Sequence, residues 1–235
     1  MIGPDLRPRE VLFSGACVCL AFCILIGCSN PGPQPAKPVT LEFSLSLDPD
    51  VYSRSHYKKP PQFAIWIEDT AGEKIRTIWV TEKTGAGSWG GEIVRPVSLP
   101  YWVSRWNKET GRSGDPTPEN PAADAVTGAT PKQDLTCRIE VPAATKWNCF
   151  VEVNVSGDFN DSFSAESKDG QKDRNGNGQP SIIYRGQITA HPGRRSEPKL
   201  IGRTHQFEAV SNVIPDIEGI SDAKDLFSQI EVSAR

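Results

Sequence analysis

Apolar and polar residues alternate along much of the chain after residue 38. In the segment VTLEFSLSLD at 39–48, Val39 and every second residue up to Leu47 are apolar. A period of two places these side chains on one face of an extended strand. Further strand-like segments, which alternate or form short apolar runs between turn residues, lie at 62–68, 74–82, 135–141, 147–155, 181–188, 199–207 and 229–233. The pattern therefore predicts a protein built mainly of short strands.

Two pairs of these strands are expected to be neighbours. The segments 62–68 and 74–82 are separated by five residues that include Gly72, which predicts a hairpin. The segments 135–141 and 147–155 are joined by a short connector, which predicts a second antiparallel pair. Short strands between turn-rich loops indicate an all-β fold, an antiparallel immunoglobulin-like β-sandwich with long loops and at most short helices.

Two short helices are predicted beside the strands. Ser221 can cap a helix over 222–228. The segment LPYWVSRW at 99–106 places Trp102 and Trp106 four residues apart, so both indoles would share one face of a helix. Two interpretations are open: the rings fill the edge of the sandwich, or they form an aromatic platform for a flat ligand.

Composition adds limits rather than a function. The chain has 235 residues, a formal net charge of −3 and 37% hydrophobic residues, which suffices for one sizeable domain. Charges are nearly balanced, so nothing favours nucleic acid as a partner.

The N-terminal segment has the features of a secretory signal. Arg7 and Arg9 precede an apolar run at 11–27, and the run ends in Leu-Ile-Gly-Cys at 25–28. This ending resembles the bacterial lipobox, which implies that Cys28 is lipid-modified and becomes the new N-terminus. A transmembrane anchor is the alternative, because 17 apolar residues nearly span a bilayer.

The predicted organisation has three parts. They are a lipoprotein signal peptide at 1–27, a Pro-rich tether at 28–38 and a single β-sandwich domain at 39–235. Such a protein would lie in the cell envelope, lipid-anchored at the outer membrane or facing the periplasm.

Only Cys137 and Cys149 lie in the predicted domain, because the other four cysteines belong to the N-terminal segment at 1–28. An extracytoplasmic compartment permits a disulfide. In the predicted pair of strands a register with Cys137 opposite Cys149 is allowed, so a disulfide is expected. The alternative is two buried free thiols.

The segment DAVTGAT at 124–130 is the strongest candidate for chemistry. It can be a plain turn, in which Asp124 and Thr127 bond to backbone N–H groups and Gly128 supplies a positive φ. It is also similar to the Asp-x-x-(Ser/Thr)-Gly-Ala-(Ser/Thr) motif of FMN-binding domains, such as those of sodium-pumping quinone reductases. There a flavin transferase attaches FMN by a phosphoester to the final hydroxyl. The resemblance implies Thr130 as the acceptor, with Asp124, Thr127, Gly128 and Ala129 as recognition residues; the following proline departs from the motif.

A wider resemblance covers most of the chain between about 61 and 233. The matching segments are PQFAIWIEDTAGEKIRTIWV, LPYW, DAVTGATPK, EVNVSGDFND, NGQPSIIY and LIGRTH. They resemble an uncharacterised family of predicted periplasmic bacterial proteins, which is associated with flavin transferases and PepSY-type membrane redox proteins and has no assigned reaction.

These resemblances imply a non-catalytic extracytoplasmic module associated with a flavin-dependent redox system. Its partners would be a flavin transferase and a membrane redox protein. The alternative is a cofactor-free binding or scaffold lipoprotein that recognises a glycan or an envelope partner.

The segment DRNGNG at 173–178 predicts a calcium site. Asp173, Asn175 and Asn177 stand at positions 1, 3 and 5 of a calcium-loop pattern, and a glycine follows. The acid that closes such loops is missing, and Asp169 would replace it from upstream. A solvated Asn-Gly turn is the alternative. In the nearby GDFND, Asp158 and Asp161 are either paired carboxylates or turn formers.

Overall fold

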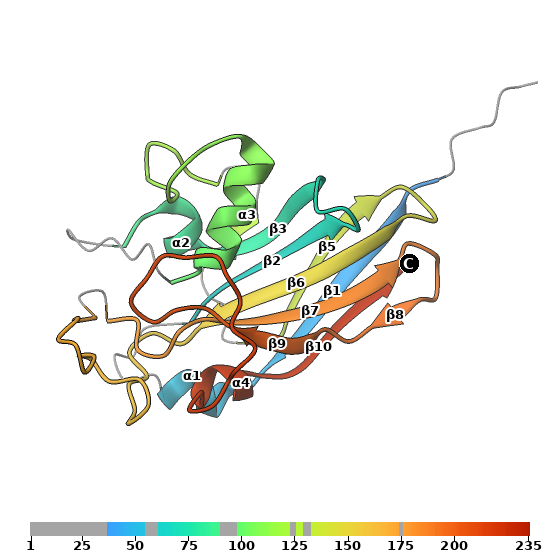
Figure 1. Cartoon of the computed structure of the whole chain (residues 1–235). Coiled ribbons are helices and arrows are strands. Elements are labelled where there is room, and N and C mark those ends of the chain that lie inside the picture. Colours follow the sequence, from blue (N-terminus) through green and yellow to red (C-terminus); the bar gives the residue numbers. More distant parts are fainter. Residues whose placement is uncertain (1–36, 55–60, 90–97, 123–125, 129–132, 174–175) are drawn as a thin grey trace, which may run out of the picture. The chain divides into compact units, whose positions relative to one another are not determined.

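The computed structural model describes residues 37–54, 61–89, 98–122, 126–128, 133–173 and 176–235. The chain from Ala36 to Arg235 forms one compact unit, whose strands belong to two sheets (Figure 1). Cys28 and the predicted signal peptide lie outside the described residues. Among the helices that are described, none has the length and apolar character needed to cross a membrane.

One sheet has four strands and is antiparallel throughout. Its order is β5 (Leu135–Val141), β1 (Val39–Leu47), β10 (Phe227–Ala234) and β8 (Arg195–Ser196). In the middle of this sheet, Phe43 of β1 is paired with Cys137 on one side and with Val232 on the other. The first and last strands of the described chain are therefore neighbours.

The other sheet has six strands. Its order is β4 (Val126–Gly128), β3 (Ile75–Thr81), β2 (Gln62–Asp69), β6 (Lys146–Asn154), β7 (Ile182–Thr189) and β9 (Lys199–Arg203). All neighbours are antiparallel except β4, which runs parallel to β3 at the edge. The predicted hairpin of β2 and β3 is confirmed.

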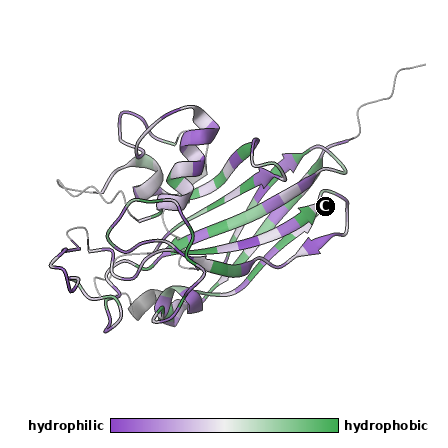
Figure 2. Ribbon diagram, viewed as in Figure 1, coloured by the Kyte–Doolittle hydropathy of each residue, from purple (hydrophilic) through white to green (hydrophobic). Residues whose placement is uncertain are grey.

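The main hydrophobic core lies between the two sheets. Leu41, Phe43 and Leu45 of β1 are at most 1% exposed, as the alternation of β1 predicts. From the facing sheet, Phe63 stacks on Trp79 with ring centroids 4.4 Å apart. Figure 2 shows the hydrophobic positions concentrated along the central strands, with hydrophilic ones frequent in the loops.

The predicted all-β sandwich is thus confirmed. It is immunoglobulin-like in having two packed sheets of mainly antiparallel strands. Its strand order is different, because first and last strands belong to opposite sheets in immunoglobulin domains, whereas β1 and β10 pair here.

A second hydrophobic core lies on the outer face of the six-stranded sheet, under helix α3 (Pro100–Thr110). Trp66 of β2 stacks on Phe150 of β6 at 5.1 Å, and Trp102 and Trp106 contact each other on the inner face of α3. Strand β2 is therefore buried on both faces and loses the alternation that a half-buried strand shows.

The predicted helix and the shared face of its two indoles are confirmed. The aromatic platform is not found, because Trp102 and Trp106 are at most 2% exposed. The remaining helices are short: α1 (Pro49–Arg54), α2 (Glu82–Ala86) and α4 (Asp222–Asp225). Helix α4 is shorter than predicted, because β10 begins at Phe227.

The predicted pairing of the strands at 135–141 and 147–155 is wrong. Strand β5 pairs with β1, and β6 pairs with β2 and β7, so the connector passes from one sheet to the other. Both arrangements direct the same apolar faces into the core, which is why alternation and connector length did not distinguish them.

The predicted disulfide is not present either. Cys137 on β5 and Cys149 on β6 are free thiols that belong to different sheets. Burial raises the pKa of each thiol to about 12, so neither is a reactive thiolate at neutral pH. The alternative of two free thiols packed against the core is what the structure has.

Candidate functional site

The segment predicted to accept a flavin is partly described. Thr127 and Gly128 belong to β4 and lie beside Val80 and Thr81 of β3 in parallel register. Asp124, Ala129 and Thr130 lie outside the described residues. β4 stands at the end of the strand order, and no other described strand pairs with its outer side.

The surroundings of β4 are fixed by buried polar contacts. Thr81 is fully buried, and its hydroxyl donates to Gln62 Oε1 at 2.7 Å. The hydroxyl of Thr84 in α2 donates to the same oxygen at 2.9 Å. The N–H of Ala122, four residues before β4, donates to the carbonyl of Gly85 at 2.8 Å. The residues next to β4 in β3 and α2 are therefore held in place by hydrogen bonds.

The predicted calcium loop is brought together only in part. The N–H of Gly178 donates to Asp173 Oδ2 at 2.8 Å, and Asn177 is buried with Oδ1 accepting the Ser98 hydroxyl at 3.1 Å. Asn175 lies outside the described residues. Asp169 is exposed.

Asp158 and Asp161 differ in burial, which does not favour the interpretation as paired carboxylates. Asp161 is exposed, whereas Asp158 is 5% exposed and packs against Gly178. Its pKa is raised to about 8, chiefly by burial; the N–H of Gln179 opposes this rise, and the negative charges of Asp222 and Asp173 add to it. Alternation carries no signal for this contact, because Asp158 lies in a loop beyond β6.

In the part of the chain that is described, no three His, Cys, Asp or Glu side chains already form a group able to hold a metal ion. A cation near Asp158 would thus need amide, carbonyl or water oxygens in addition to carboxylates.

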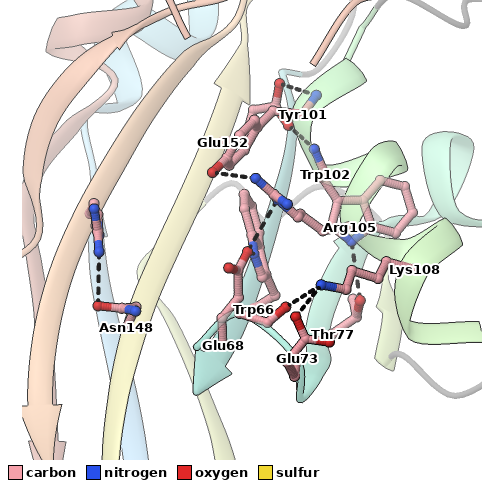
Figure 3. A network of polar contacts seen from close by, with 12 residues as sticks. Trp66, Glu68, Glu73, Thr77, Tyr101, Trp102, Arg105, Lys108, Asn148 and Glu152 are labelled. Atoms are coloured by element: carbon pink, nitrogen blue, oxygen red, sulfur yellow. Dashed lines mark hydrogen bonds and ion pairs between the residues drawn. The ribbon is translucent and has the colours of Figure 1, made fainter. Parts of the chain in front are cut away.

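A second buried carboxyl group, Glu152 of β6, lies beneath the first turn of α3 (Figure 3). It accepts the backbone N–H groups of Tyr101 at 3.3 Å and Trp102 at 2.6 Å, and the hydroxyl of Ser181 at 2.6 Å. Burial raises the pKa of Glu152 to about 7, although these three donors oppose the rise. The sequence reasoning missed this residue, because polar side chains on a strand normally face water.

Neighbouring polar contacts complete the attachment of α3. The indole N–H of Trp66 donates to Glu68 at 2.9 Å, and Arg105 of α3 forms an ion pair with the same carboxylate at 3.3 Å. Arg105 also donates to the hydroxyl of Tyr101 at 3.0 Å. These groups bond to each other, so the network holds the helix on the sheet.

A cleft of about 660 Å³ lies where the β2–β3 turn, the end of α3 and the β5–β6 connector meet. Its lining is charged and partly apolar: Asp69, Glu73, Lys74, Ile75, Arg76, Lys108, Glu109, Pro142, Thr145, Lys146 and Trp147. Lys108 is held to the turn, since its ammonium group donates to the Gly72 carbonyl at 2.8 Å. The cleft can take a small polar ligand that carries negative charge and hydroxyl groups.

Comparison with protein-family models, with curated proteins and with solved structures finds no match to this chain. The two resemblances that the sequence suggests therefore remain predictions, which rest on the residues quoted for them.

Proposed function

We propose that the chain is a non-catalytic extracytoplasmic module of a flavin-dependent redox system and that it carries FMN on Thr130. The observation that supports this proposal is the position of Thr127 and Gly128 in an edge strand of the six-stranded sheet. A modifying enzyme reads an extended segment most readily where one side of its backbone is free to pair.

The chemistry asks little of the carrier. The hydroxyl oxygen of Thr130 would displace AMP from the pyrophosphate of FAD, forming the phosphoester bond to FMN while the hydroxyl proton is lost. Small neighbours such as Gly128 and Ala129 allow the transferase and the phosphate to approach. The bound flavin would supply one- or two-electron transfer, and the sandwich would supply its position.

The proposed location follows from the N-terminal sequence. Lipid modification of Cys28 would anchor the module in the cell envelope, and the Pro-rich tether at 28–38 would hold the domain off the membrane. The anchored domain could then reach a flavin transferase and a membrane redox protein in the same compartment.

Covalent flavin is tested directly by co-expressing the chain with a flavin transferase and running a denaturing gel. The wild-type band should fluoresce, and Thr130→Val should abolish the fluorescence. Thr136→Val is the matched control, because it removes an exposed hydroxyl of β5 outside the motif. A dark wild-type band, or fluorescence that persists in Thr130→Val, contradicts the proposal.

A second candidate function is cofactor-free binding of an acidic envelope glycan in the cleft. The cleft itself favours it: Lys74 and Lys146 can attract carboxylates of uronic acids, while Asp69 in the same lining can accept a hydroxyl group. The tryptophans do not provide the surface first considered for a glycan, since Trp66, Trp79, Trp102, Trp106 and Trp147 are all at most 5% exposed.

Calorimetry with a short oligouronate tests this candidate. Binding should be lost in Lys146→Gln and kept in Lys168→Gln, which removes an exposed charge outside the cleft. It should also weaken as salt rises, because exposed charges are screened. Equal binding by both variants would exclude the cleft.

A further inference from the structure

Three segments that are distant in the sequence meet beyond the end of β6 and the start of β7. Gln179 joins them: its side-chain amide donates to the carbonyl of Asp158 at 2.8 Å and to the hydroxyl of Ser221 at 2.7 Å. The N–H of Ser221 donates back to Gln179 Oε1 at 2.7 Å. This frame fixes the loop at 156–158, the loop at 177–179 and the first turn of α4 relative to one another.

Two carboxylates converge on Gly178 within this frame. Its N–H donates to Asp173 Oδ2 at 2.8 Å, while its Cα lies so close to Asp158 that an added Cβ would be 2.4 Å from Asp158 Oδ1. A positive φ of 78° at Gly178 makes this close approach possible. Both acids are thus held against the same tight turn.

Two buried polar atoms here have no hydrogen-bond partner among the described residues: Asp158 Oδ2 and Asn177 Nδ2. Their side chains belong to residues 5% and 1% exposed. Leaving such atoms unpaired is costly, and most for a carboxylate. A 180° rotation of the Asn177 amide would let its nitrogen donate to the Ser98 hydroxyl and turn its oxygen to the unpaired position.

Two further carboxylates act on Asp158 with negative charge. Asp173 and Asp222 each raise the pKa of Asp158 through their negative charge. No ion pair in the described chain joins Asp158 or Asp222 to a basic side chain. The fold therefore concentrates negative charge around an unsatisfied oxygen.

We propose that Asp158, Asp173 and the side-chain oxygen of Asn177 bind a calcium-like divalent cation, with Asp222 acting through a bridging water. Calcium takes six to eight oxygen ligands, including amide and carbonyl oxygens and water, so three acids in direct contact are not required. The ligand set differs from the one predicted from the sequence, since Asp158 replaces Asp169. The proposal does not depend on the flavin or the cleft.

The test measures the melting temperature of the purified chain with about 10 mM calcium chloride and with a chelator at matched ionic strength. At about ten times the dissociation constant, calcium should raise the melting temperature of the wild type by roughly 3–6 °C. Asp158→Asn should lose this shift, because it keeps the shape and the Gln179 contact but removes the charge. Asp161→Asn, an exposed acid of the same loop, should keep it.

Two results would overturn the proposal. One is a wild-type melting temperature that calcium does not change; if Asp158→Asn is then more stable than wild type, a proton rather than a cation satisfies the site. The other is a shift that Asp158→Asn and Asp173→Asn both retain, which would place the cation elsewhere. Should either variant fold poorly, terbium luminescence decides in its place. The wild type and Asp222→Asn are each titrated with terbium, and calcium is added as the competing ion.

Discussion

Glu152 of β6 caps helix α3 by accepting the backbone N–H of Trp102 at 2.6 Å, although the two residues are 50 positions apart. The N-cap residue of the helix is Leu99, whose side chain offers no acceptor. First-turn N–H groups of a helix need partners, and a carboxylate also interacts favourably with the helix dipole. A residue of the sheet thus performs the task that Ser, Thr or Asp usually performs locally.

The first prediction concerns pH. Because the pKa of Glu152 rises from 4.5 to about 7 on folding, the folded state binds the proton more tightly. Its contribution to stability is fully present below pH 4.5 and is lost as the pH rises through 7. The loss amounts to about 3 kcal/mol at 1.36 kcal/mol per pKa unit.

Glu152→Gln isolates this effect. Glutamine can still accept from Trp102 and can donate to Ser181, whose hydroxyl is free to donate to Thr204 at 2.7 Å. The free energy of unfolding of the variant relative to wild type should rise by about 3 kcal/mol between pH 4.5 and 8, measured by urea denaturation. Asp158 titrates in both proteins and cancels. Glu140→Gln, exposed on β5, should show no such trend; a flat difference for Glu152→Gln would refute the assignment.

The second prediction concerns the outer core. Trp102 is fully buried between α3 and the six-stranded sheet, so Trp102→Ala should lower the free energy of unfolding by about 3–5 kcal/mol. Ile217→Ala is the apolar control, because Ile217 is 37% exposed and should change stability by no more than about 0.5 kcal/mol. Similar effects of the two changes in denaturant unfolding would contradict the burial of the indole.

The third prediction compares two glycines with left-handed backbones. Gly170 has a φ of 81° and open space around a Cβ, so Gly170→Ala should cost only the backbone strain, about 1–2 kcal/mol. Gly178 has a φ of 78°, but its Cβ would meet Asp158, so Gly178→Ala should cost at least about 3 kcal/mol. Thermal unfolding of both variants checks this difference in stability. Equal losses of stability would contradict the close contact between Gly178 and Asp158.

The fourth prediction concerns the thiols. A version of the chain lacking the N-terminal segment retains only Cys137 and Cys149. Without reductant, the denatured protein should react with two equivalents of a thiol reagent. The folded protein should react more slowly, because Cys149 is buried, Cys137 is partly buried and the pKa of both thiols is raised. If the denatured protein reacts with no thiol reagent, the two cysteines form a disulfide and the prediction is wrong.

The sequence predicts the strands well because alternation reports directly on burial. Val39 to Leu47 show this plainly: every second side chain is buried in β1. Spacing also predicts α3, because two tryptophans four residues apart lie on the same face of a helix. The alternation does not predict which strands pair, as β5 and β6 show. It indicates that one face of a strand is buried, but not which strand lies beside it or which sheet covers it.

The candidate sites are harder to predict because their members are assembled from distant loops. The sequence pattern at 173–178 predicts Asp173 and Asn177 as ligands, but no pattern in the sequence predicts that Asp158 packs against Gly178. Glu152 is missed for a related reason: its acceptor role is set by a helix that lies 50 residues earlier. Long-range contacts of this kind depend on topology and leave no local pattern.

The pairing of β1 with β10 has a consequence for how the chain folds. β1 is made early and β10 very late, so one layer of the sandwich stays incomplete until nearly the whole described chain is available. Until then, the apolar face of β1 and one row of its backbone groups remain uncovered, which is the state in which strands associate with other chains. Contacts between such distant segments also slow the search for the native state. A newly made chain therefore passes through an interval in which it is prone to aggregate, and a chaperone that shields the first strand would favour folding during that interval.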